Sequence, residues 1–283
     1  MKKYWHLIRV NHYVKNFLIF LPLFFSKNII NSHYLINTII GFLVFCLMAS
    51  FIYIINDVKD LEKDRLHPIK KNRPLAYSAI SRKRAIIIGV FMFILAVILI
   101  IYFLPHNYEL WLVLGLYIIS NLGYSIGLKK IPLLDIMILT LGFIIRLFFG
   151  ALISNIQVSN WLYLTVMSMA FYISLGKRKT ELSQSGLKSR DVLKYYNPIF
   201  LDKFISICIS LTITFYSLWC INQDYHLSRY LVWTIPLILL ICMKYSLTME
   251  HTNNDPVDIL LKDKILLILL GLYLIVITII IYI

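Results

Sequence analysis

The chain has 283 residues, 60% of them hydrophobic, and its mean hydropathy is +0.78. A soluble domain is about 45 to 50% apolar, so this composition excludes an ordinary water-soluble fold. The formal net charge of +14 suggests nucleic acid, but the Lys and Arg residues lie in short segments between apolar stretches rather than on one soluble face. We therefore expect a protein that resides in a lipid bilayer and has no nucleic-acid partner.

Apolar stretches follow one another along the whole chain. A helix needs about 20 apolar residues to cross a bilayer, and a membrane helix satisfies its own backbone groups. No alternating strand pattern appears, so the predicted fold class is an all-α polytopic membrane helical bundle. The nine expected spans are 16–30, 34–55, 85–104, 110–128, 131–153, 161–176, 204–221, 230–243 and 265–283, in a single transmembrane domain of residues 1–283. The first is short and is interrupted by Pro22 and Lys27.

The distribution of basic residues predicts the orientation, because cytoplasmic loops retain Lys and Arg during insertion. With nine spans, 25 of the 28 basic residues fall on one side of the membrane. The opposite loops hold only Lys27 and Arg229, and Arg146 lies inside a span. We expect a multi-pass protein of the cytoplasmic membrane with its N-terminus inside, its C-terminus outside and its active site facing the cytoplasm.

Acidic residues are crowded at the cytoplasmic end of the second span, in the segment Asn56-Asp57-Val58-Lys59-Asp60-Leu61-Glu62-Lys63-Asp64. If the helix continues, Asn56, Asp60 and Asp64 recur every four residues and share one face, close to Asp57. Oxygen ligands suit Mg²⁺, which takes one or two carboxylates and completes its shell with water and substrate phosphate. We predict a magnesium site formed by Asn56, Asp57, Asp60 and Asp64, and a phosphorylated substrate.

A plainer interpretation of the acidic segment is also available. Its carboxylates could pair with Lys59, Lys63 and Arg65 on a solvated helix end, as most charge runs do. The helical spacing at a membrane exit favours the functional interpretation.

Cations in the other cytoplasmic loops complement the predicted metal. Arg73 follows the acidic helix, Lys129 and Lys130 follow Tyr124, and Lys177-Arg178-Lys179-Thr180-Glu181 follows the sixth span. The guanidinium group of Arg binds phosphate with two hydrogen bonds, and the ammonium group of Lys binds it as a point charge. These groups could therefore hold two phosphates. The alternative is that they serve topology alone, and that Lys177 and Glu181, four residues apart, pair along one helix.

Arg146 is a charged residue inside a predicted span, where such residues usually face the bundle interior or a water-filled cavity. Asp135 lies eleven residues earlier on the same face, about 16 Å away by helical rise, too far for direct contact. Gly142 and Gly150 flank Arg146 and would let a neighbouring helix approach closely. We favour a cavity-lining role for Arg146 over a purely structural buried pair.

The acidic segment resembles the NDxxDxxxD motif of the UbiA superfamily of intramembrane prenyltransferases. Within that superfamily the chain looks most like the decaprenyl-phosphate phosphoribosyltransferase branch. The supporting segments are residues 9–16, 67–74, 124–130 and 176–182, and Asp255-Pro256 with Asp263, so the resemblance covers essentially the whole chain. Aromatic prenyltransferases carry a second acidic motif after the sixth span, where this chain has Lys177-Arg178-Lys179-Thr180-Glu181.

The resemblance implies a Mg²⁺-dependent transfer of 5-phosphoribose from 5-phosphoribosyl diphosphate to a polyprenyl (decaprenyl) phosphate, for cell-envelope polysaccharide synthesis. Cations in place of the carboxylates of the second acidic motif suit a donor that carries an additional phosphate. The phosphate of the polyprenyl phosphate is already anionic, so its attack would need no strong general base. The nearest candidate for such a base is His67, but a single loop histidine before a proline, here Pro68, more often has a structural role. The alternatives are an aromatic prenyltransferase of quinone biosynthesis and a non-catalytic lipid-binding or transport protein; a homo-oligomer is left open.

The expected site residues follow from the motif and the basic loops. The catalytic residues are Asp57, Asp60 and Asp64, and the metal ligands are these three with Asn56. The expected substrate contacts are Lys15, Asn16, Arg73, Tyr124, Lys129, Lys130, Arg146, Lys177, Arg178 and Glu181.

Overall fold

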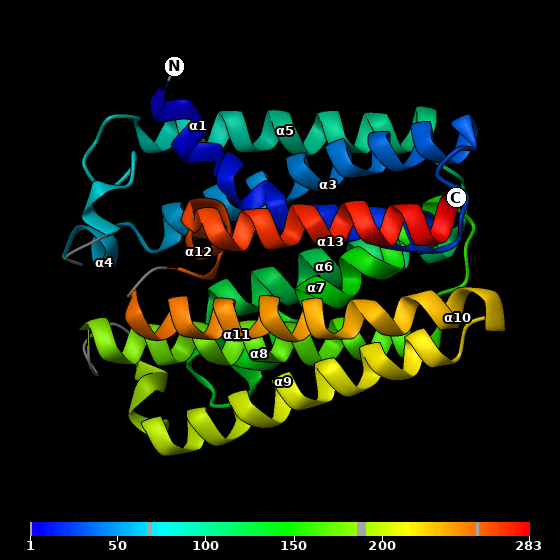
Figure 1. Ribbon diagram of the computed structural model, residues 1–283. Helices are drawn as coiled ribbons and strands as arrows, with labels where there is room; N and C mark the ends of the chain where they lie inside the picture. Colours follow the sequence, from blue (N-terminus) through cyan, green and yellow to red (C-terminus); the bar gives the residue numbers. More distant parts are fainter. Residues whose placement is uncertain (1, 67–69, 186–190, 253–254) are drawn as a thin grey trace. The chain divides into compact units, whose positions relative to one another are not determined.

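The computed structural model describes residues 2–66, 70–185, 191–252 and 255–283, and helices dominate all four ranges (Figure 1). These ranges contain no strand, which confirms the all-α fold class. Seven described helices are long and apolar enough to cross a membrane. They are Ser32–Lys59, Arg82–Phe103, Tyr108–Ile126, Leu134–Ile153, Pro198–Ile221, Tyr225–His251 and Lys264–Tyr282.

Two of the nine expected spans are missing from that set. The first is divided into the 3₁₀ helix η1 (Val10–Phe20) and the short helix α2 (Leu21–Phe25), because Pro22 lacks an N–H and favours the start of a new helix. The sixth expected span lies in helix α8 (Asn160–Ser185), which is long enough but runs on into the polar segment that begins at Lys177. The nine-span count and the orientation therefore stay predictions.

The chain forms two compact units, and helix α7 (Leu134–Ile153) contributes to both. Unit 1 consists of Met1–Lys129 and Ile145–Gln157, and unit 2 of Lys130–Ile144 and Val158–Ile283. The expectation of a single domain over residues 1–283 stays a prediction.

Unit 1 is built on the long helix α3 (Ser32–Lys59), which packs along α5 (Arg82–Phe103) (Figure 1). Its other elements are α1 (Lys2–Ile8), η1, α2, α4 (Leu61–Leu66), η2 (Lys70–Asn72), α6 (Tyr108–Ile126), most of η3 (Leu128–Lys130) and the end of α7. The side chain of Asn31 caps the start of α3, and that of Ser81 caps the start of α5. A cluster at the other end of α3 buries Leu7, Ile54 and Leu75 together. This cluster holds α1 beside the end of α3 that carries the acidic segment.

A contact in unit 1 confirms the close helix approach that the sequence predicts at Gly150. A Cβ at Gly150 of α7 would lie 2.1 Å from the backbone oxygen of Ile19, so only glycine permits this approach. The close contact brings η1, which carries Asn16, against the part of α7 that carries Arg146.

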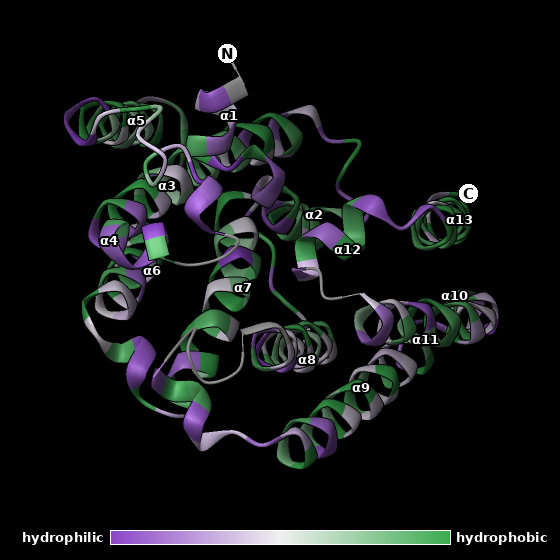
Figure 2. Ribbon diagram, turned by 90° about the vertical axis from the view of Figure 1, so that its left-hand side faces the viewer, coloured by the Kyte–Doolittle hydropathy of each residue, from purple (hydrophilic) through white to green (hydrophobic). Residues whose placement is uncertain are grey.

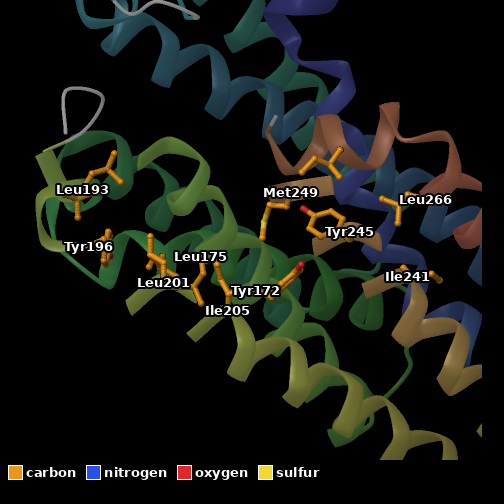
Figure 3. Packing of buried hydrophobic residues seen from close by; sticks show 13 residues of the cluster. Tyr172, Leu175, Leu193, Tyr196, Leu201, Ile205, Ile241, Tyr245, Met249 and Leu266 are labelled. Carbon is orange, nitrogen blue, oxygen red and sulfur yellow. The ribbon is translucent and has the colours of Figure 1, made fainter. Parts of the chain in front are cut away.

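Unit 2 is built on α8, which packs along α9 (Pro198–Ile221). Its other elements are the start of α7, η5 (Asp191–Tyr195), α10 (Tyr225–Leu231), η6 (Val232–Thr234), α11 (Ile235–His251), α12 (Pro256–Lys262) and α13 (Lys264–Tyr282). Figure 3 shows the core of unit 2, in which Tyr172 of α8 and Tyr245 of α11 lie with ring centroids 5.7 Å apart. Tyr196 and Leu201 extend this core toward η5 and α9.

The most apolar helices expose their side chains rather than bury them. Figure 2 shows α5 and α13 mostly in the colour of hydrophobic residues. Only 17% of the most apolar stretch of each helix is buried inside the protein, which suits contact with lipid tails.

Candidate active site

The acidic segment lies where α3 ends and α4 begins. The structure interrupts the expected continuous helix at Asp60, a bend residue between Lys59 and Leu61. The backbone N–H of Asp60 still donates to Asn56 at 2.9 Å, and that of Asp64 donates to Asp60 at 2.9 Å. Because these bonds span four residues, the helical spacing of Asn56, Asp60 and Asp64 persists through the bend.

Two arginines hold Asp57 and Asp64. The Oδ1 atom of Asp57 accepts hydrogen bonds from Arg9 and, at 3.0 Å, from Arg73. Arg73 also donates to Asp64 at 2.6 Å. The Asp57 and Asp64 side chains are only 4% and 7% exposed, so these ion pairs are well shielded from water. The solvated helix end of the alternative interpretation does not describe these two residues.

The two arginines differ in their electrostatic surroundings. Burial acts against the charge on Arg9, but Asp57 and Tyr53 more than offset it, so the pKa of Arg9 is raised. Burial and the neighbouring charge of Arg9 lower the pKa of Arg73, although Asp57 and Asp64 act in the opposite direction. Asp57 lies between two like charges and keeps them together.

Asp60 and Asn56 have separate partners. The ammonium group of Lys129 donates to both carboxylate oxygens of Asp60, at 2.7 and 2.6 Å. Asn56 accepts a hydrogen bond from the hydroxyl of Ser125 at 3.0 Å. The side chain of Asp60 is 21% exposed, more than either of the other two aspartates.

The donor set is compatible with Mg²⁺. In the part of the chain that the structure describes, no group of three or more His, Cys, Asp or Glu side chains is placed to hold a metal. Mg²⁺ usually takes one or two carboxylates and keeps several waters, so a ready-made cluster of three is not required. Asp60 and Asn56 offer oxygen ligands only, which is the chemistry that Mg²⁺ prefers.

Two further predicted site residues of unit 1 contact each other. The guanidinium Nε of Arg146 donates to Asn16 at 2.7 Å, and its carbon lies 4.8 Å from the centre of the Phe45 ring. Arg146 is 4% and Asn16 1% exposed, so the pair is buried. The other two candidates in this unit, Lys15 of η1 and Tyr124 of α6, are half-buried.

The predicted cations of unit 2 all contact carboxylates. Lys130 lies 3.6 Å from Asp191, and Lys177 lies 3.3 Å from Asp255. Arg178 donates to Asp135 at 2.6 Å and to Glu181 at 2.5 Å. Glu181 therefore pairs with Arg178 rather than with Lys177, contrary to the alternative expectation of a pair four residues apart.

The residues that hold the predicted site residues but that the sequence did not single out include Arg9, Tyr196 and, as a partner of Arg178, Asp135. Arg9 belongs to the segment 9–16 that supports the family resemblance, which was a usable signal. Tyr196 has no such signal, because its contact with Asp135 joins residues 61 positions apart. His67, the candidate base, lies outside the described residues.

A comparison with protein families identifies the family of this chain. The profile of the UbiA prenyltransferase family matches residues 19–261. The chain belongs to the UbiA prenyltransferase family. It is accordingly a multi-pass membrane transferase of this superfamily.

Two relatives of this chain carry the same name. A decaprenyl-phosphate phosphoribosyltransferase from Corynebacterium glutamicum is 30% identical over 272 residues, covering 93% of this chain and 81% of the relative. The enzyme of the same name from Mycolicibacterium smegmatis is 32% identical over 244 residues, covering 81% of this chain and 76% of the relative.

A solved structure of a UbiA homolog from Archaeoglobus fulgidus, bound to GPP and Mg²⁺, confirms the fold. It superimposes with a TM-score of 0.72 at 18% identity, covering 99% of this chain and 100% of that one. Mg²⁺ binding is thus a property of a UbiA homolog, which supports Mg²⁺ for the superfamily.

Proposed function

We propose that this protein transfers 5-phosphoribose from 5-phosphoribosyl diphosphate to a polyprenyl phosphate, decaprenyl phosphate in the simplest case, and releases diphosphate. The product would feed cell-envelope polysaccharide synthesis at the cytoplasmic face of the cell membrane. The similarity to decaprenyl-phosphate phosphoribosyltransferases over most of the chain supports this activity.

The observation that carries the proposal is the cationic end of α8. Lys177, Arg178 and Lys179 follow one another there, and the Lys177 and Lys179 side chains are 25% and 29% exposed. A donor of prenyl diphosphate brings two phosphates, whereas phosphoribosyl diphosphate brings a third on the ribose. Partly exposed ammonium groups suit that additional phosphate.

In unit 1, Asp57, Asp60 and Asp64 with Asn56 form the proposed catalytic and metal-binding set. Asp60 and Asn56 would hold Mg²⁺, which when bound would place positive charge against the diphosphate of the donor. Ion pairs with Asp57 and Asp64 hold Arg9 and Arg73 beside this set of residues. The ion pair of Lys129 with Asp60 adds a third cation. The other proposed substrate contacts are Lys15, Asn16, Tyr124 and Arg146 in this unit, and Lys130 in unit 2.

The chemistry needs little from the protein except position and charge. A phosphate oxygen of the polyprenyl phosphate forms the new bond to the anomeric carbon, and the bond from that carbon to diphosphate breaks with its electron pair on diphosphate. The attacking oxygen is already anionic, so no proton has to be removed. Cations around the leaving group, Arg9, Arg73 and Lys129, stabilise the charge that develops there.

The test is a reconstitution with purified protein, Mg²⁺, polyprenyl phosphate and phosphoribosyl diphosphate labelled in the ribose. We expect label in the lipid fraction, loss of the transfer when EDTA removes Mg²⁺, and recovery when Mg²⁺ is restored. Transfer from a prenyl diphosphate to an aromatic acid, with no label in the lipid, would overturn the proposal. So would binding of the lipid without turnover of either donor.

A further inference from the structure

Arg178 is fully buried although it stands between two partly exposed lysines. Its side chain is 0% exposed, whereas those of Lys177 and Lys179 are 25% and 29% exposed. Its Nε donates to Asp135 at 2.6 Å, and its Nη1 donates to Glu181 at 2.5 Å. The guanidinium group is therefore directed into the protein rather than toward a solvent-borne phosphate.

Asp135 joins three segments of unit 2. Its carboxylate, 0% exposed, accepts from Arg178 of α8 and, at 2.6 Å, from the hydroxyl of Tyr196, which follows η5. The same hydroxyl accepts the backbone N–H of Leu133 at 2.7 Å. Leu133 has a positive φ of 66°, a conformation that leucine rarely adopts, so this hydrogen bond stabilises a strained turn just before α7.

The buried ion pair between Arg178 and Asp135 differs from the partly exposed ion pairs of the two flanking lysines. A buried ion pair cannot exchange its carboxylate for a substrate phosphate without leaving Asp135 unpaired in a low-dielectric interior, which is costly. Lys177 and Lys179 have partly exposed partners, Asp255 at 3.3 Å and Asp202 at 2.6 Å, and water can replace those contacts. On a helix, neighbouring residues point about 100° apart, so fixing Arg178 determines where both lysines leave α8.

We propose that Arg178 is a positioning residue: with Asp135, Tyr196 and Glu181 it fixes the end of α8 against the start of α7 and η5, so that Lys177 and Lys179 bind a phosphate group of the donor. Arg178 does not itself touch the substrate. This inference rests on the proposed function and replaces, for Arg178 and Glu181, the substrate contact that the sequence suggested.

The pair offers a test that separates positioning from contact. Arg178→Met leaves the carboxylate of Asp135 buried without its cation. Adding Asp135→Asn removes that charge and retains an oxygen that can accept from the Tyr196 hydroxyl. A lost substrate ligand cannot be restored by a second substitution at Asp135, whereas a lost buried pair can, because uncharged replacements of such pairs are often well tolerated.

The experiment compares Arg178→Met, Asp135→Asn, the double variant, Lys177→Met and Lys179→Met in the full-length protein, with Lys203→Met, an exposed lysine, as control. We measure the melting temperature, the KM for phosphoribosyl diphosphate and the Kd for ribose 5-phosphate, which carries the phosphate on the ribose but no diphosphate. Arg178→Met should lower the melting temperature by about 10 °C. The double variant should recover most of that loss and bind ribose 5-phosphate within about threefold of the parent, whereas each lysine variant should weaken binding about tenfold without destabilisation.

Two results would overturn the inference. One is a double variant that regains its melting temperature but still binds ribose 5-phosphate as weakly as Arg178→Met. The other is a parent protein that binds neither ribose 5-phosphate nor phosphoribosyl diphosphate. If the parent binds ribose 5-phosphate but does not turn over phosphoribosyl diphosphate, the proposed function fails, and the ribose 5-phosphate affinities still decide the role of Arg178.

Discussion

Asp60 differs from Asp57 and Asp64 in exposure and in the kind of cation that holds it. Its partner is the flexible ammonium of Lys129, whereas Asp57 and Asp64 are held by the guanidinium forks of Arg9 and Arg73. A carboxylate that must accept a metal benefits from a partner that can move away. This difference separates the aspartates by function, although the motif presents them alike.

Asp60→Asn should therefore abolish catalysis and spare the fold. We expect turnover to fall at least about 100-fold, because a group that stabilises developing charge contributes that much or more. The melting temperature should change little, since a partly exposed ion pair contributes about 1 kcal/mol at most. Asp258→Asn, which removes an exposed pair with Lys262, is the matched control and should keep full activity. Normal turnover in Asp60→Asn would contradict the assignment.

Asp57→Asn should behave in the opposite way with respect to stability. The substitution leaves Arg9 and Arg73 close together without the negative charge that lies between them. Breaking a buried charge network typically costs about 3 to 5 kcal/mol. We expect a much lower melting temperature than that of Asp60→Asn, measured in the same detergent. Equal melting temperatures for the two variants would show that the arginines do not depend on Asp57.

Among the elements, the crossing of η1 and α7 depends on a single missing side chain. Gly150→Ala would place a Cβ 2.1 Å from the backbone oxygen of Ile19, and backbone cannot move aside as a flexible side chain can. We expect a destabilisation of about 1 to 3 kcal/mol, as for other overpacked sites. Gly115→Ala in α6, where a Cβ meets nothing within 4 Å, is the control and should be neutral or stabilising. A neutral Gly150→Ala would argue against the close crossing.

The start of α13 is held by the carboxylate of Asp263. Hydrogen bonds from Lys244 and Thr248 lower its pKa, and its other oxygen caps the backbone N–H groups of Ile265 and Leu266. Because the pKa is lower in the folded protein, the stabilisation is present above the unfolded value, about 3.9, and is lost as the pH falls below it.

Asp263→Asn isolates that charge, since the amide oxygen can still cap the helix. We expect the parent to melt at a higher temperature than the variant near pH 6, with the difference shrinking as the pH falls toward 3. Asp224→Asn, at a helix start where the side chain makes no capping hydrogen bond, is the matched control. A constant difference across this range would mean that the Asp263 charge contributes nothing.

At the scale of the whole molecule, the count and direction of the membrane crossings decide which face carries the site. With nine crossings and the N-terminus inside, Lys27 and His106 lie outside and Lys63 and Lys262 lie inside; all four are exposed. We expect a membrane-impermeant maleimide to label Lys27→Cys and His106→Cys in intact cells, in a background without native cysteines. Lys63→Cys and Lys262→Cys should label only after the membrane is opened. Labelling of all four in intact cells, or the reverse pattern, would refute the orientation.

The sequence was sufficient for the fold class and the family. Apolar stretches of membrane length and the NDxxDxxxD pattern are local features, so they can be recognised without coordinates, and the helices and the family profile confirm them. The first span was harder to predict, because Pro22 divides the segment into the 3₁₀ helix η1 and the short helix α2. The length of an apolar stretch does not reveal such a division.

Only the tertiary structure decided which carboxylate each cationic side chain contacts. The sequence presents Lys177, Arg178 and Lys179 as equivalent cations, and burial by distant segments makes Arg178 an internal partner of Asp135 while leaving the lysines partly exposed. In the same way, Arg9 reaches Asp57 across 48 residues and Lys129 reaches Asp60 across 69. Which carboxylate a cation neutralises depends on long-range packing, because the desolvation that makes such pairing necessary arises only when distant helices come together.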